Sequence, residues 1–169
     1  GFFEFGSERV TVEATPDYSQ GERLWCHPGL RPLSQLQDTV SSPIGAYRWD
    51  FTDRALTQQL LLEDEGNPAT VEPGHAAIRY VNPTNGRDVM PTIRCEFHRL
   101  RPGRETLARQ EVGSSVFQVF EGSGAVVLNG ETKVLNKGDL FVVPSWISWS
   151  LQADTQFDLF RFSDAPIME

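Results

Sequence analysis

The pattern of apolar and polar positions changes near Pro73, where an irregular first part gives way to short, closely spaced apolar runs. Several of these runs alternate with polar residues, and a period of two is typical of strands with one buried face. The predicted strands cover residues 77–81, 93–98, 116–120, 125–128, 132–135, 140–143, 147–151 and 157–162. Asn129-Gly130 predicts a hairpin turn, and Lys137-Gly138-Asp139 predicts another turn. Short strands at this spacing predict an all-β sandwich or barrel.

One region before Pro73 has the periodicity of a helix. Thr52 and Asp53 are both good N-cap residues, and the spacing after them predicts a short helix that ends near Gly66. The apolar residues of this helix that we expect to face a core are Leu56, Leu60 and Ala55.

Residues 1–45 contain scattered Pro, Gly and Ser and little periodicity, which predicts an extended arm. The arm carries large apolar side chains, namely Phe2, Phe3, Phe5, Leu24 and Trp25. Because an extended segment cannot bury them by itself, we expect the arm to dock on its own barrel or on a neighbouring chain and to support a homo-oligomer. The sequence thus predicts an arm with one short helix over residues 1–72 and a β-barrel over residues 73–169.

Composition restricts the class of protein and its partners. A chain of 169 residues with 39% hydrophobic content suits one single-core domain with an extension. Its 23 acidic and 15 basic residues give a net charge of -8, which argues against nucleic acid and anionic membranes as partners. The first residues lack a secretion signal, and no apolar run is long enough to span a membrane. Cys26 and Cys95 form no C-x-x-C pair, so we expect a soluble, cytoplasmic protein with two reduced thiols.

Two motifs in the second part of the chain resemble the paired motifs of the cupin family. The first comprises Pro102-Gly103, Arg109-Gln110-Glu111, Ser115 and Glu121-Gly122-Ser123-Gly124. The second comprises residues 137–146, from Lys137-Gly138-Asp139 to Pro144-Ser145-Trp146, and then Trp149. The resemblance implies a cupin double-stranded β-helix, which is a jelly-roll barrel.

Further stretches resemble the bicupin gentisate 1,2-dioxygenases in particular. They are Phe2-Phe3-Glu4, Ser42-Pro43, Tyr47-Arg48-Trp49, residues 52–56, Tyr80-Val81-Asn82-Pro83, Thr84-Asn85-Gly86 and Val89-Met90-Pro91-Thr92. The run 141–146 is the most specific, and the resemblance spans nearly the whole chain. It implies the C-terminal half of an enzyme family that converts gentisate and oxygen to maleylpyruvate. The iron(II) centre of that family, with three histidine ligands, is expected in an N-terminal cupin outside this sequence.

The resemblance also implies where metal ligands would stand in this barrel, namely at Arg109, Glu111, Ser115 and Trp149. Arginine has no lone pair to offer, tryptophan presents only an N–H donor, and a neutral serine hydroxyl is a poor ligand. Only Glu111 has the chemistry of an iron ligand. We therefore expect no metal and no catalytic residue in this chain, and a structural role that supports the catalytic cupin and builds the oligomer.

The candidates for a pocket at the barrel mouth are His98, Arg109, Glu111, Gln118, Trp146 and Trp149. Arg109 and Glu111 are two positions apart, so on a strand they would share a face and could form an ion pair that fills the former metal position. Loss of Glu111 would then cost about 3–5 kcal/mol. The alternative is a solvated mouth of charged residues.

The histidines and aromatic residues allow more than one interpretation. His98 shares a predicted strand face with Arg94 and Glu96, which suits a hydrogen-bonded wall residue, while His27 and His75 lie in loop-like contexts and are predicted at the surface. The large aromatic residues Phe141, Trp146, Trp149, Phe157 and Phe160 could line a pocket for a flat ligand, but they suit a core better.

Two other functions stay open at the level of sequence. One is a stand-alone cupin without metal that binds an aromatic acid as a sensor or carrier, with Arg109 holding the carboxylate. The other is a metalloenzyme with unusual ligands, such as His98 and Glu111 around iron.

Overall fold

The structure is a computed structural model that describes residues 20–26, 32–34 and 47–169. The chain divides into two compact units, Gly1–Ala46 and Tyr47–Glu169. The first unit contains helix α1 (Gln20–Trp25), so the prediction of an extended arm is wrong for these six residues. Glutamine, glutamate, arginine and leucine all have good helix propensity, and a helix of six residues is too short to show a periodic pattern. Phe2, Phe3, Phe5 and His27 lie outside the described residues, and the boundary between residues 72 and 73 stays a prediction.

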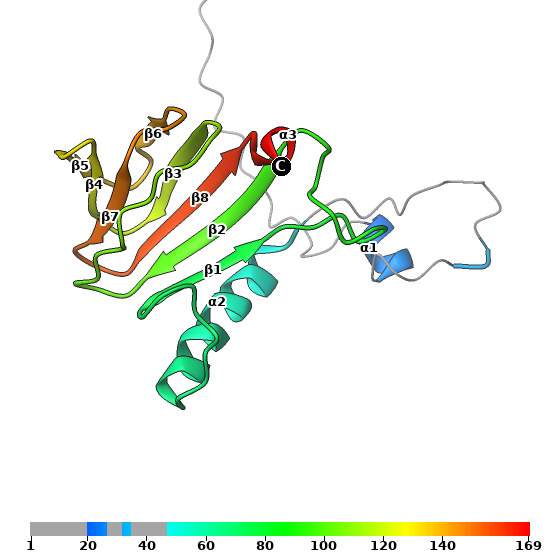
Figure 1. The fold of residues 1–169 in the computed structure, drawn as a ribbon. Coiled ribbons are helices and arrows are strands. Elements are labelled where there is room, and N and C mark those ends of the chain that lie inside the picture. The colour runs from blue at the N-terminus through cyan, green and yellow to red at the C-terminus, as the bar shows by residue number, and fades with distance from the viewer. Residues whose placement is uncertain (1–19, 27–31, 35–46) are drawn as a thin grey trace, which may run out of the picture. The chain divides into compact units, whose positions relative to one another are not determined.

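The unit Tyr47–Glu169 is built on two antiparallel sheets (Figure 1). The five-stranded sheet has the order β1 (His75–Arg79), β2 (Arg94–Leu100), β8 (Phe157–Ser163), β3 (Ser115–Glu121) and β6 (Leu140–Val143). The three-stranded sheet has the order β5 (Glu131–Leu135), β4 (Gly124–Leu128) and β7 (Trp149–Ala153). Helix α3 (Ala165–Met168) follows β8. Each predicted strand is present to within two residues at either end, and the expected all-β jelly-roll is confirmed.

The hairpin between β4 and β5 shows why its turn was predictable. Leu128 pairs with Glu131, which leaves a loop of two residues. Asn129 and Gly130 both have positive φ, at 50° and 84°. A two-residue loop of this kind needs left-handed backbone at both positions, and Asn-Gly provides it at low cost.

Helix α2 (Trp49–Asp64) covers the outer face of β1 and β2 (Figure 1). Leu56 is fully buried against Ala76 and Phe97, with Leu60 beside them, so the predicted apolar side of the helix is confirmed. The helix begins before the predicted start, with Arg48 as the N-cap residue. The prediction of an N-cap at Thr52 or Asp53 is therefore wrong. Instead, the Thr52 hydroxyl forms a hydrogen bond of 2.9 Å with the Tyr80 hydroxyl.

Strand β2 departs from the predicted pattern because both of its faces are covered. Phe97 and Arg99 lie on the face under α2, and both are buried. The opposite face points into the barrel and carries Glu96, His98 and Leu100. Polar side chains in the interior must find partners there, because an unpaired buried charge is costly. The polar face of β2 therefore marks the part of the interior where a site could lie.

Elsewhere the interior between the sheets is apolar. Phe141, Trp149 and Phe157 are buried in its main cluster, and the rings of Phe117 and Phe141 stack at a centroid distance of 4.9 Å. Phe160 packs against the smaller cluster under α2. The interpretation of the aromatic residues as core is thus confirmed for these residues. None of the described helices is long and apolar enough to cross a membrane.

Candidate functional site

A buried guanidinium group, that of Arg161, lies at the polar end of the barrel interior. The alternation of β8 places Arg161 on the same inward face as Phe157 and Leu159. Its Nη2 donates to Glu111 Oε2 at 2.6 Å and to Ser115 Oγ at 2.8 Å, its Nε donates to Ser115 Oγ at 3.0 Å, and its Nη1 donates to Glu96 Oε2 at 3.0 Å. A planar cation with several acceptors around it is stable in such a place because it satisfies its donors and neutralises the carboxylates.

Two aromatic rings complete the surroundings of this cation. The guanidinium carbon of Arg161 lies 5.4 Å from the ring centroid of Phe117 and 5.4 Å from that of Trp149. These distances are within the range of cation–π attraction, which is stronger where water is excluded. Apolar rings and acidic oxygens thus hold one positive charge from different sides.

The four positions where the cupin resemblance implies metal ligands share this region. Three of them, Glu111, Ser115 and Trp149, contact Arg161 as described. The fourth, Arg109, has its guanidinium carbon 5.9 Å from the Trp149 ring, and its Nη2 donates to Glu72 Oε1 at 3.1 Å. The predicted ion pair between Arg109 and Glu111 is therefore wrong. Residue 109 forms an isolated bridge with Trp149 outside any continuous strand, so the assumed common face does not exist, and each side chain pairs with an opposite charge from another element.

A row of hydrogen-bonded side chains, Glu72, His75, His98 and Glu96, runs from Arg109 to Arg161. His75 Nδ1 lies 3.2 Å from Glu72 Oε1, His75 Nε2 lies 2.9 Å from His98 Nδ1, and His98 Nε2 lies 3.3 Å from Glu96 Oε2. His98 is buried, so its interpretation as a hydrogen-bonded wall residue is confirmed. The prediction of a surface position for His75 is wrong. His75 opens β1 directly after the turn at Gly74, and its side chain points into the barrel.

The protonation of this row follows from its contacts. Burial and the charge of His98 lower the pKa of His75 to about 4, against the opposing effect of Glu72. Burial by itself raises the pKa of Glu96. The hydrogen bond from His98 and the positive charges of His98, Arg161 and Arg94 have the larger, opposite effect and bring this pKa down to about 2. Three contacts in the row each need one N–H, whereas two neutral imidazoles supply only two. Two neutral imidazoles therefore leave one of the three contacts without a proton.

The chemistry of the donors does not suit a metal ion. Glu111 and Ser115 already accept hydrogen bonds from Arg161, and Trp149 offers its ring to the same cation. Within residues 20–26, 32–34 and 47–169, no group of three or more His, Cys, Asp or Glu side chains could hold one. His98 and Glu111, the pair considered as iron ligands, both lead to Arg161. His98 contacts Glu96, which accepts from Arg161, and Glu111 accepts from Arg161 directly.

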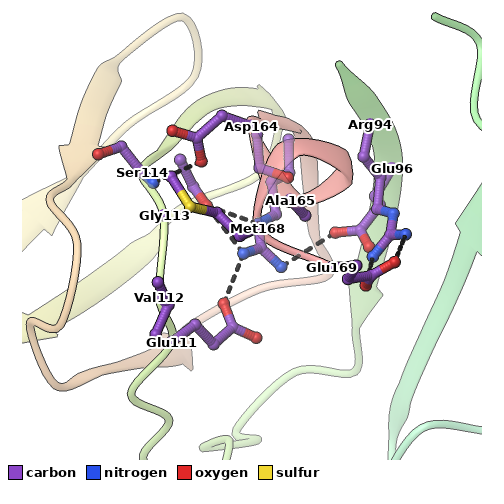
Figure 2. A pocket seen from close by; sticks show the side chains of 13 residues that line it. Arg94, Glu96, Glu111, Val112, Gly113, Ser114, Asp164, Ala165, Met168 and Glu169 are labelled. Atoms are coloured by element: carbon purple, nitrogen blue, oxygen red, sulfur yellow. Dashed lines mark hydrogen bonds and ion pairs between the residues drawn. The ribbon is translucent and has the colours of Figure 1, made fainter. Parts of the chain in front are cut away.

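A pocket of about 290 Å³ opens beside Arg161 and under helix α3. Figure 2 shows Glu96, Glu111, Met168 and Glu169 among the side chains that line it, with Glu169 beside Arg94 and Glu96. Of the six predicted pocket residues, only Glu111 lines it. Gln118 is exposed, because β3 turns its neighbours Phe117 and Val119 inward. Trp146 is 60% exposed and has a φ of 65°, so its indole belongs to neither the core nor this pocket.

Two residues that matter here were missed from the sequence. Arg161 lies in the predicted last strand, two positions after Leu159 and four after Phe157, and this even spacing is the signal that places it inside. Glu72 precedes β1 and gave no such signal. Its carboxylate accepts hydrogen bonds from the backbone N–H of Leu107 and the side chain of Arg109, which are distant in the sequence. Cys26 and Cys95, the two cysteines, are both free, as predicted.

Two known proteins similar to this chain carry the names of dioxygenases, although no protein-family profile matches it. It is 54% identical over all 169 residues to a gentisate 1,2-dioxygenase of Streptomyces sp, and 31% identical over 160 residues to a 5-aminosalicylate 1,2-dioxygenase of Comamonas sp. It spans less than half of these relatives, 47% and 41% of their lengths, while they match 100% and 94% of the chain.

A solved structure is also similar, that of a variant salicylate 1,2-dioxygenase from Pseudoaminobacter salicylatoxidans in complex with gentisate. The TM-score is 0.80 and the sequence identity is 81%, over 99% of this chain and 46% of that one. This likeness confirms the expected cupin-type fold.

Proposed function

We propose that this chain, which is closely homologous over its whole length to part of the gentisate 1,2-dioxygenases, is the structural half of an aromatic ring-cleaving dioxygenase. Its barrel would hold no metal. The catalytic iron(II) would lie in an N-terminal cupin that corresponds to the remaining length of the relatives, and this half would support that cupin and take part in a homo-oligomer.

The observation that carries the proposal is the position of Arg161. Three of the four side chains at the expected ligand positions contact one fixed cation, as they would otherwise surround a metal ion. A metal ion and a guanidinium group cannot occupy the same space. A metal ion next to the buried guanidinium group would also be repelled strongly by its positive charge. The chain thus supplies from its own sequence the positive charge that the barrel interior needs.

The substrate class of the whole protein follows from the relatives. The two relatives and the solved structure carry the names of gentisate, 5-aminosalicylate and salicylate 1,2-dioxygenases. All three substrates are benzoic acids with a hydroxyl group next to the carboxylate. We infer that the whole protein cleaves a substrate of this class and that this chain contributes no residue to the chemical step.

The first test is iron binding by this chain under anaerobic conditions. The chain would be incubated with iron(II), freed of unbound metal, and assayed for metal per chain by elemental analysis and for gentisate turnover in the same sample. We expect neither retained iron nor turnover. The matched control is a longer protein that adds the N-terminal cupin, which should retain iron and consume gentisate.

The two rival functions predict different outcomes in this test. Stoichiometric iron with turnover by the chain alone would refute the structural role and favour a metalloenzyme with unusual ligands. Saturable binding of gentisate without iron and without turnover would favour a sensor or carrier. Arg109 would then have to leave Glu72 to hold the carboxylate, so Arg109→Ala should abolish that binding.

A further inference from the structure

The loop between β1 and β2 contains motif residues that the proposed function does not use. This loop lines a second pocket, of about 530 Å³, which shares Arg94 and Glu169 with the pocket beside Arg161. Three arginines line it, Arg79, Arg87 and Arg94, together with two carboxylates, Asp88 and Glu169. The chain as a whole carries a net charge of -8, so a pocket with more cations than anions differs from its average surface.

Arg94 presents two sides of its guanidinium group to two different carboxylates. Its Nε and Nη2 donate to the two oxygens of Asp88 at 2.9 and 3.1 Å. Its Nη1 and Nη2 donate to the two oxygens of Glu169 at 2.8 and 2.9 Å. The second arrangement is the bidentate geometry with which arginine recognises a planar carboxylate.

The two carboxylates on Arg94 differ in how firmly they are held. The side chains of Arg94 and Asp88 are 13% and 14% exposed, whereas that of Glu169 is 66% exposed. An exposed ion pair is weak, because water and salt compete with it. Asp88 therefore fixes the orientation of Arg94, and Glu169 occupies a position that another carboxylate can take at little cost.

The rest of the pocket suits an organic anion. In the part of the chain that the structure describes, Arg87 makes no ion pair and its side chain is exposed, and Arg79 Nε lies 3.8 Å from Asp88 Oδ1. Val89, Met90 and Pro91 add an apolar wall. A volume of this size is within the usual range for small-molecule sites, which combine apolar surface with a few directed polar groups.

We propose that this pocket binds a small organic carboxylate, whose carboxylate group replaces that of Glu169 on Arg94 and whose body rests on Val89, Met90 and Pro91. Arg87 and Arg79 at the rim attract the anion. Glu169 acts as an internal competitor, so the site is partly blocked until a ligand displaces it. The proposal does not depend on the function proposed for the barrel.

The test is a titration of the 169-residue chain with benzoate, followed through its amide shifts in two-dimensional NMR spectra. We expect saturable shifts in the loop between β1 and β2. Glu169→Gln, which removes the competing charge, should tighten binding by up to about fivefold, the factor that an exposed ion pair represents. Arg87→Ala should weaken binding and leave the fold unchanged, because Arg87 is exposed. Neutral benzamide should not bind.

Several outcomes would overturn the proposal. Absence of saturable shifts with benzoate would do so, as would equal binding of benzamide, because then the carboxylate is not recognised. Binding unchanged in both variants would place the ligand elsewhere. Saturation by inorganic phosphate but not by benzoate would show an anion site of a different class.

Discussion

Replacement of Arg161 by methionine removes the buried cation and keeps most of the side-chain volume. Glu111 and Ser115 lose a donor, and Glu96 loses the nearest of its positive partners. The cost depends on what each acceptor can do afterwards. Glu111 is 42% exposed and can be solvated in place, whereas Glu96 is 19% exposed and remains inside the barrel.

The magnitude follows from the carboxylate that stays buried. Removal of one partner from a buried ion pair costs about 3–5 kcal/mol. We expect the lower end, about 3 kcal/mol, because Glu96 keeps its contact with His98. For a unit of this size, that loss corresponds to a decrease in the melting temperature of about 10 °C.

Acid should reduce the difference between the two proteins. The folded pKa of Glu96 is about 2, below its ordinary value of 4.5. A depressed carboxyl pKa stabilises the folded state above the ordinary value, and this stabilisation is lost as the pH falls through the folded pKa. The destabilisation by Arg161→Met should therefore be full at neutral pH and smaller at about pH 3, below the ordinary pKa of Glu96, where Glu96 of the variant can take up a proton because Arg161 no longer holds it ionised.

The assay is urea unfolding followed by circular dichroism, at neutral pH and in acid. Lys137→Met is the matched control, because it removes the same charge from an exposed pair in which Lys137 Nζ lies 2.6 Å from Glu121 Oε2. That pair is worth about 0–1 kcal/mol. If Arg161→Met destabilises the protein no more than the control does, Arg161 is not the charge that the barrel interior requires.

Three further perturbations test other parts of the structure. Asp158→Asn weakens the bidentate pair with Arg99 under α2, at 2.9 and 2.8 Å, and should cost about 3 kcal/mol in urea unfolding; a loss below 1 kcal/mol would contradict the burial of this pair. Burial and the charge of His98 lower the pKa of His75 from 6.5 to about 4, so the unfolded chain binds a proton that the folded chain excludes, and stability should fall as the pH drops through this interval. His75→Gln should flatten that dependence, and an unchanged slope would assign it to other groups. Burial raises the pKa of the Cys95 thiol, so exposed Cys26 should react first with a thiol reagent, and Cys26→Ser should remove the fast phase and leave the slow one.

The strands were predictable because their signal is local. Alternation within five to seven residues reveals a strand, and Asn129-Gly130 specifies its own turn whatever surrounds it. The hydrogen bonding of His98 was also predictable, since His98 and Glu96 are two positions apart and lie on one face of β2.

The pairing of charges was not predictable because it depends on contacts between distant elements. Glu96 and Arg161 are 65 positions apart, and Arg99 and Asp158 are 59 apart. The coverage of both faces of β2 was unpredictable for the same reason. Helix α2 covers the face of Phe97, and the face of Glu96 and His98 turns inward. A single strand does not reveal which of its two faces meets the core when both are covered.

Arg161 also affects how the barrel reaches its folded state. A protein cation is made with the chain, so it cannot be extracted by a chelator, exchanged for a competing ion or oxidised. Domains organised around a bound ion couple their folding to the supply of that ion. We expect the unit Tyr47–Glu169 to fold without that dependence, and to keep its melting temperature in the presence of EDTA. In a cell short of iron, a barrel of this kind would persist in its folded form.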